Sequence, residues 1–286
     1  MFFSFKHLII SFLLVSSIIH SNGMEKMVFS EWNKPEINIF YKLPNKITEN
    51  TKIIFVIHGN SRNADGYLNV WMKLANKHNV LLIAPEFNRS SFPSYNTLMM
   101  STSSGRIREN KDLYLNNSID LFFEHFNEKF GLEARNYMIY GHSGGSQFVH
   151  RYLLLSDNPK ASKAVAANAG WYTFLHGAPY PYGIKNPPIE LTSAHIRRFL
   201  NTEIHILIGS EDVKVDSSVN QSDGANAQGR NRFQRANNFF NVTTDIVEEN
   251  NLDFKWKYQI VNGAAHSNSK MSKAAAKILL KDLEEW

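Results

Sequence analysis

The stretch YMIYGHSGGSQFVHRYLLL, residues 137–155, decides the fold of this chain. Its first four residues form an apolar strand pattern, and residues 146–155 form a helix pattern. Between them lies GHSGG, residues 141–145, whose glycines permit a cramped turn from strand to helix with Ser143 at its centre. A strand that turns directly into a helix is typical of proteins that alternate the two around a parallel sheet.

The rest of the chain continues this alternation. Strands are expected at residues 37–41, 53–57, 80–84, 163–169, 204–208 and 254–261, and helices at 65–78, 113–130 and 272–286, with a further late helix opening at 228–233. The pattern predicts an α/β fold: a mostly parallel central sheet with helices on both faces. Because no long helical insertion interrupts it, we expect no large lid over the carboxyl ends of the strands, where such sheets bind ligands.

Composition limits the classes of function. The 286 residues carry a formal charge of +5, and their lysines and arginines are scattered without a basic stripe, so we expect no nucleic-acid partner. Cysteine is absent, which excludes thiol chemistry. The sequence contains no metal-ligand spacing and no phosphate-cradling loop, and it therefore implies no metal and no cofactor.

The first 23 residues are predicted to be a signal peptide. Lys6 precedes an apolar run over residues 8–19, and Ser21-Asn22-Gly23 supplies the small-residue cleavage site, so we expect a secreted or periplasmic protein. An uncleaved anchor is the alternative, although the run is shorter than the roughly 20 residues of a spanning helix. No second apolar segment reaches that length, so residues 24–286 should form a single domain without stable membrane insertion.

Ser143 is the candidate nucleophile, and a serine nucleophile needs a general base. His266 is the only histidine beyond Ile208, and it follows the strand expected at 254–261. There it would lie in the loop after the last strand, within reach of Ser143. The chain order, with the serine first and the histidine last, is the one that this arrangement requires.

The third catalytic residue should be an acid that orients the imidazole. Residues 160–188 contain no Asp and no Glu, which excludes the loop after the strand at 163–169. The strand at 204–208 is followed by Gly209-Ser210-Glu211-Asp212. Asp212 is the prediction, because the turn places its carboxylate at the top of the strand; Glu211 and Asp216 are the alternatives.

Two backbone amides are expected to bind the oxyanion: that of Gly144, after the nucleophile, and that of Asn60, in the loop His58-Gly59-Asn60. His58 is interpreted as a structural histidine, and His142 as a packing residue that points away from Ser143. Trp171 and Tyr172 open an aromatic, proline-rich stretch and are predicted to line the substrate pocket; a packed loop without ligand is the alternative.

Residues 57–60, 141–145, 209–212 and 263–267 together resemble the α/β-hydrolase superfamily. Within it, the chain is most similar to secreted poly(3-hydroxybutyrate) depolymerase-like and feruloyl-esterase-like hydrolases. This resemblance implies a serine hydrolase that cleaves carboxylic esters through an acyl-enzyme. Many extracellular members carry a cysteine where this chain has Asn60, and no substrate-binding module is appended.

These departures favour soluble esters of hydroxyalkanoate, acyl or feruloyl type, so a small-molecule or oligomeric ester is the expected partner. Two other functions stay open. A peptidase or thioesterase would use the same triad, because one constellation serves several acyl bonds. A catalytically inactive hydrolase fold could instead serve as an exported binding protein.

Overall fold

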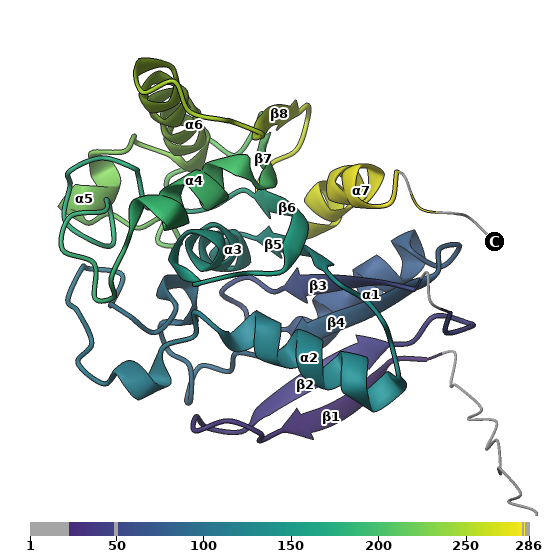
Figure 1. Cartoon of the computed structure of the whole chain (residues 1–286). Helices are drawn as coiled ribbons and strands as arrows, with labels where there is room; N and C mark the ends of the chain where they lie inside the picture. The colour runs from purple at the N-terminus through teal and green to yellow at the C-terminus, as the bar shows by residue number, and fades with distance from the viewer. Residues whose placement is uncertain (1–22, 49–50, 282, 284–286) are drawn as a thin grey trace, which may run out of the picture.

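The computed structural model describes residues 23–48, 51–281 and 283, so all of the predicted signal peptide except Gly23 lies outside the described residues. It contains one sheet of eight strands (Figure 1). The strands are β1 (Glu25–Phe29), β2 (Ile37–Lys42), β3 (Lys52–Ile57), β4 (Val80–Pro85), β5 (Tyr137–His142), β6 (Ala161–Ala167), β7 (Glu203–Gly209) and β8 (Lys257–Val261).

The strand order is β1-β2-β4-β3-β5-β6-β7-β8. Strands β1 and β2 are antiparallel to their neighbours, and all pairs from β4 to β8 are parallel. The prediction of a mostly parallel α/β sheet is therefore confirmed. As a consequence, the carboxyl ends of β3, β5, β6, β7 and β8 meet along one edge, where ligand sites of such sheets form.

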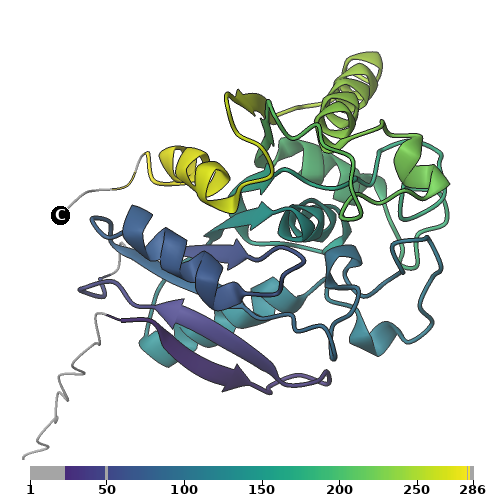
Figure 2. The same ribbon diagram turned by 180° about the vertical axis from the view of Figure 1, so that it is seen from behind.

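Helices cover both faces of the sheet, as Figures 1 and 2 show from opposite sides. The helices are α1 (Ala64–Leu74), α2 (Ser118–Phe130), α3 (Gly144–Leu155), α4 (Ser193–Asn201), α5 (Asp223–Asn226), α6 (Arg232–Glu249) and α7 (Asn268–Leu279), with 3-10 turns η1 (Tyr95–Thr97) and η2 (Lys111–Leu113). The apolar residues of α1 and α7 pack on one face, and those of α2, α3, α4 and α6 pack on the other.

Strand β3 shows why the sheet is buried on both sides. Its alternate residues Ile53, Phe55 and Ile57 join the core under α2 and α3, while Ile54 and Val56 join the core under α1 and α7. All five are fully buried. A continuous β-branched and aromatic run is what a strand with two covered faces requires.

Several boundaries differ from the predictions. Strand β1 and helices α4 and α5 were not expected. Helix α2 begins at Ser118 rather than at residue 113, because Lys111–Leu113 forms a separate 3-10 turn and Tyr114 continues in extended backbone. No helix among the described residues is long and apolar enough to cross a membrane.

The loop after β4 packs into the core although its sequence looks polar. Phe92, Tyr95 and Leu98 are buried in it. Arg62 holds it in place by donating to the carbonyls of Phe92 and Pro93 at 2.9 and 3.0 Å, with its guanidinium 4.1 Å from the ring centre of Tyr95. Tyr95 in turn donates to the carbonyl of His58 at 2.7 Å, so this loop supports the strand ends around Ser143.

Candidate active site

Ser143 occupies the turn between β5 and α3 in a strained backbone conformation, with φ 58° and ψ −116°. The flanking glycines are there for steric reasons. A Cβ on Gly141 would lie 2.2 Å from the carbonyl oxygen of Gly145, and one on Gly145 would lie 2.2 Å from that of Ile57. Larger residues could not close this turn, which lifts the serine hydroxyl clear of its own backbone at the carboxyl edge of the sheet.

The structure brings Ser143, His266 and Asp212 into one hydrogen-bonded chain. Nε2 of His266 lies 2.9 Å from Oγ of Ser143, and its Nδ1 lies 2.7 Å from Oδ2 of Asp212. An ionised carboxylate can only accept, so Nδ1 carries the proton and Nε2 presents its lone pair to the serine hydroxyl. The three residues come from the turns after β5, β8 and β7, which are close in space because these strand ends share one edge.

Asp212, the predicted acid, is in contact with the imidazole, and the alternatives Glu211 and Asp216 are not. It is 1% exposed, whereas Glu211 is exposed to solvent. The carboxylate of Asp216 instead accepts from the amide and hydroxyl of Ser218 and lies 3.6 Å from the amine of Lys214. The turn Gly209–Asp212 closes with the Asp212 amide donating to the Gly209 carbonyl at 3.1 Å, which turns the carboxylate inward.

Arg232 is a site residue that sequence reasoning missed. Its Nη1 lies 3.3 Å from Oδ1 of Asp212, the carboxylate oxygen that His266 does not use, and its Nη2 donates to the hydroxyl of Ser218 at 2.8 Å. Arg232 is 3% exposed, so both charges of this pair are out of water. The guanidinium provides a cation for the buried carboxylate, which would otherwise be an uncompensated charge in the protein interior. The only sequence signal for Arg232 was its position at the start of the predicted late helix.

Asn168 is a second site residue that was not predicted from the sequence. Its Nδ2 donates to the carbonyl of Ala265 at 3.1 Å, and its Oδ1 accepts from the amide of Gly209 at 2.9 Å. It therefore ties the loop of His266 to the strand end that precedes Asp212. Its backbone has φ 50°, a left-handed conformation that asparagine tolerates better than most residues.

Two buried histidines near Ser143, namely His58 and His142, have different contacts. His58 accepts from the Phe87 amide through Nε2 at 3.0 Å, and burial lowers its pKa to about 4, so it is a neutral structural residue as interpreted. His142 does not simply point away from the site. Its ring centre lies 4.8 Å from that of His266, its Nδ1 lies 2.9 Å from the hydroxyl of Tyr67, and burial lowers its pKa well below the usual value.

The two predicted oxyanion donors lie beside the nucleophile. Gly144 is the first residue of α3, where a helix amide has no partner within the helix. A Cβ on Gly144 would lie 2.5 Å from Oδ1 of Asn60, so the Asn60 side chain packs directly against it. A residue with a side chain at this position would push Asn60 aside, which explains the glycine after the nucleophile.

Ser143 and His266 open into a cavity of about 490 Å³. Small polar residues provide most of its wall: Gly59, Asn60, Ser61, Asn63, Gly66, Tyr67, Val70, His142, Ser218, Arg232, Asn268 and Ser269 join Ser143 and His266. Such a wall suits a hydrophilic acyl group better than an apolar one. Among the described residues, no cluster of His, Asp and Glu could hold a metal ion.

Trp171 and Tyr172 do not line this cavity, contrary to their predicted role in the pocket wall. They are 2% and 0% exposed. The guanidinium of Arg151 lies 3.9 Å from the Trp171 ring centre, and Tyr172 stacks on Phe239 at 4.3 Å. Trp171 and Tyr172 are thus packed within the loop, which was the alternative interpretation, whereas Phe174 and Tyr182 of the same stretch line a separate cavity.

Comparisons with known proteins found similar solved structures, but a scan against protein-family models and a search of curated proteins found no match. Among solved structures, the chain is similar to poly(aspartic acid) hydrolase-1 from Sphingomonas sp. KT-1, with 35% identity over 90% of this chain and 98% of that chain and a TM-score of 0.83.

Two other solved structures extend the comparison. LpqC, a poly(3-hydroxybutyrate) depolymerase from Bordetella parapertussis, is 25% identical over 91% of this chain and 90% of that chain, again with a TM-score of 0.83. The siderophore hydrolase EstA from Aspergillus nidulans is 13% identical over 96% of this chain and 99% of that chain, with a TM-score of 0.58, which shows a shared fold alone.

Proposed function

Because the chain belongs to the α/β-hydrolase superfamily and is a serine hydrolase, we propose that it cleaves carboxylic esters through an acyl-enzyme on Ser143. The observation that carries this proposal is the continuous hydrogen-bonded chain from Ser143 through His266 to Asp212. It supplies a nucleophile, a base with its lone pair on that nucleophile, and an acid that fixes the tautomer of the base.

In the acylation step, Ser143 attacks the ester carbonyl while Nε2 of His266 takes the hydroxyl proton. The Asp212 carboxylate stabilises the imidazolium that forms. The amides of Gly144 and Asn60 donate to the oxyanion of the tetrahedral intermediate. His266 then returns its proton to the alcohol oxygen, the carbon–oxygen bond breaks, and the alcohol leaves.

Deacylation repeats these steps with water as nucleophile. His266 takes a proton from water, the hydroxide attacks the acyl carbon, and Ser143 leaves with the proton returned by His266. The buried guanidinium of Arg232 lies 3.3 Å from Asp212, so the carboxylate that stabilises the imidazolium has a cation beside it. Among the soluble esters expected as substrates, the polar wall of the cavity supports the hydroxyalkanoate type more than the aromatic feruloyl type.

Amide hydrolysis on the same residues is the second candidate. It is favoured by the 35% identity to a poly(aspartic acid) hydrolase, since the units of that polymer are joined by amide bonds. We also propose that residues 1–23 are removed on export. Amino-terminal sequencing of protein recovered from the medium or periplasm tests this, and an intact Met1 would contradict it.

A fluorophosphonate probe tests the hydrolase proposal directly. It should label the folded protein, and Ser143→Ala should abolish the labelling. Labelling that survives in Ser143→Ala, or no labelling of the unaltered protein, would contradict the proposal and favour an inactive binding protein. A parallel screen of p-nitrophenyl esters, hydroxybutyrate oligomers, feruloyl sugars and poly(aspartic acid) then separates ester from amide hydrolysis.

A further inference from the structure

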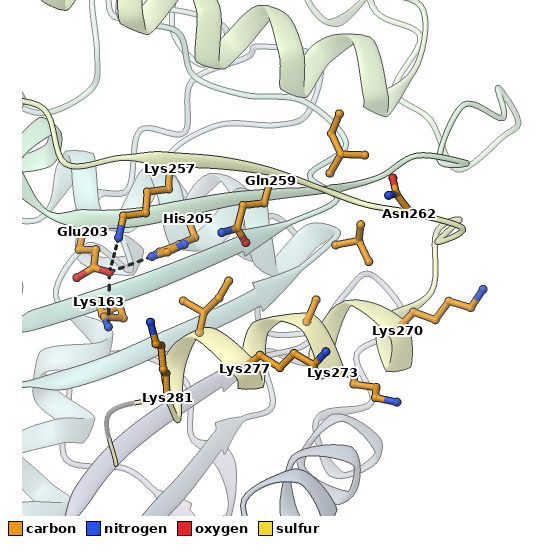
Figure 3. Close-up of a pocket in the computed structure, with 14 residues that line it drawn as sticks. Lys163, Glu203, His205, Lys257, Gln259, Asn262, Lys270, Lys273, Lys277 and Lys281 are labelled. Atoms are coloured by element: carbon orange, nitrogen blue, oxygen red, sulfur yellow. Dashed lines mark hydrogen bonds and ion pairs between the residues drawn. The ribbon is translucent and has the colours of Figure 1, made fainter.

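A second, larger groove lies between the outer strand β8 and helix α7 (Figure 3). Its volume is about 840 Å³. Six lysines line it, and among the described residues only one acid does: the lysines are Lys163, Lys257, Lys270, Lys273, Lys277 and Lys281, and the acid is Glu203. The lysines lie between positions 163 and 281 of the sequence and gather only in the folded chain.

The groove forms where strands β7 and β8 present polar residues toward α7. On the face toward α7, β7 presents Glu203 and His205 and β8 presents Lys257 and Gln259, where a covered sheet would present apolar residues. Helix α7 instead packs through the buried Met271, Ala275 and Leu279, which belong to the core shared with α1. The residues of α7 that line the groove are Ala274, Ile278 and the three lysines labelled on this helix in Figure 3, and Lys281 follows the helix.

The acids of the described part of the chain neutralise the positive charge of the groove only in part. Glu203 lies within 3.6 Å of the amines of Lys163 and Lys257 and 3.0 Å from His205, so its charge is already engaged. Lys273 and Lys277 are exposed and form no ion pair with any acid of the described part. The groove therefore keeps an excess of cations that a ligand could use.

The groove adjoins the candidate active site. Asn268 and Ser269, the first residues of α7, line the cavity of Ser143, while Lys270 lines the groove. The Lys270 amine donates at 2.6 Å to the carbonyl of Gly263, three residues before His266. One helix thus borders both hollows, and a chain lying along α7 would point toward Ser143.

We propose that this β8–α7 groove binds a linear polycarboxylate. Lys273 and Lys277 rise by about 6 Å along the helix, close to the roughly 7 Å between same-side carboxylates of an extended amide-linked chain. Among the described residues, the groove wall has no Phe, Tyr or Trp on which bases could stack, which argues against a single-stranded nucleic acid. The groove is concave, and Ala274 and Ile278 are the only apolar residues of α7 that line it, whereas a membrane-binding helix presents a broad apolar face.

Delivery of that polymer to Ser143 rests on the proposed function, but binding in the groove does not. The test therefore measures binding in the Ser143→Ala background, with labelled poly(aspartic acid) as the probe. The groove variant carries Lys273→Glu and Lys277→Glu. The matched control carries Lys46→Glu and Lys129→Glu, which change the net charge equally at two exposed lysines outside the groove.

We expect the groove variant to raise the Kd about tenfold, because two attractive contacts become repulsive, and the control to change it less than about twofold. The neutral pair Lys273→Gln and Lys277→Gln should fall between them, and thermal unfolding checks that all variants fold. Equal losses in control and groove variants, or an unchanged Kd in the groove variant, would overturn the proposal. Stronger competition by single-stranded DNA or by anionic vesicles than by unlabelled polymer would overturn the polycarboxylate assignment.

Hydrolysis of p-nitrophenyl acetate by the unaltered protein is measured separately. If it is absent while the groove variant still loses polymer binding, the hydrolase proposal fails and the groove proposal stands. If it is present while polymer binding is insensitive to both lysines, the groove proposal alone fails.

Discussion

Nη1 of Arg232 lies 3.3 Å from Oδ1 of Asp212, and His266 binds the other oxygen of the same carboxylate. Each carboxylate oxygen thus has its own cationic or hydrogen-bonding partner in a place from which water is excluded. Because breaking a buried pair leaves one charge uncompensated, Arg232 should matter for folding as well as for the proposed catalysis.

Arg232→Met should lower the free energy of unfolding by about 3 kcal/mol, since it leaves the Asp212 carboxylate buried without its cation. Urea denaturation monitored by tryptophan fluorescence measures this loss. Arg230→Met is the matched control, because Arg230 is exposed two positions earlier, and it should change stability by less than about 0.5 kcal/mol. Equal losses in the two variants would show that the buried pair has no special role.

Asp212→Asn should reduce kcat by about 10⁴, because the amide no longer holds Nδ1 of His266 in its protonated tautomer. Glu211→Gln and Asp216→Asn should cost little, since neither side chain contacts the imidazole. Initial rates on a p-nitrophenyl ester compare all three. A large loss from either of these two, with Asp212→Asn active, would move the acid to another position.

Asn168→Gly should lower kcat about ten- to a hundredfold with little change in KM, because the loop of His266 loses its link to Gly209. Glycine is chosen because it relieves the left-handed backbone at this position. Asn168→Asp keeps the acceptor for the Gly209 amide but loses the donor to Ala265, and it should have an intermediate effect. A rise in KM at unchanged kcat would argue against a positioning role.

Acid should destabilise the fold partly through His58. Its pKa is about 4 in the folded chain against 6.5 ordinarily, so between these values the unfolded chain binds a proton that the folded chain does not. The stabilisation present above pH 6.5 is therefore lost as the pH falls toward 4, by about 3 kcal/mol. His58→Gln, which can still accept from the Phe87 amide, should flatten this loss in urea titrations at pH 4 to 7.

The exposed His176 provides the comparison for that experiment. His176→Gln should leave the acid dependence of stability as it is in the unaltered protein. If His58→Gln is as acid-sensitive as the unaltered protein, the loss originates from other buried groups, of which His142 and His150 also have lowered pKa values.

The sequence could predict the parts of this protein that depend on local sterics. The turn around Ser143 is readable because only glycine fits beside its backbone. The buried run of β3 is readable because a doubly covered strand is apolar throughout. Chain order and the absence of acids over residues 160–188 reduced the choice of acid to three neighbours, and the structure puts Asp212 against His266.

Contacts between distant segments were beyond the sequence. Arg232 meets an acid 20 positions away, and Asn168 bridges partners 41 and 97 positions away. Trp171 and Tyr172 were misplaced, because an aromatic, proline-rich stretch has the same composition whether it faces a ligand or the core. The lysines of the β8–α7 groove looked scattered because they are distant in the sequence and gather only in the folded chain.

The antiparallel pair β1 and β2 ends the sheet at the edge opposite β8 (Figure 1). Neither strand contributes a residue to the cavity of Ser143 or to the groove along α7. A tether attached ahead of Glu25 would therefore fix the protein to a solid support with both hollows facing the solution. Attachment through the region after Leu279 would instead crowd Lys281 at the mouth of the groove.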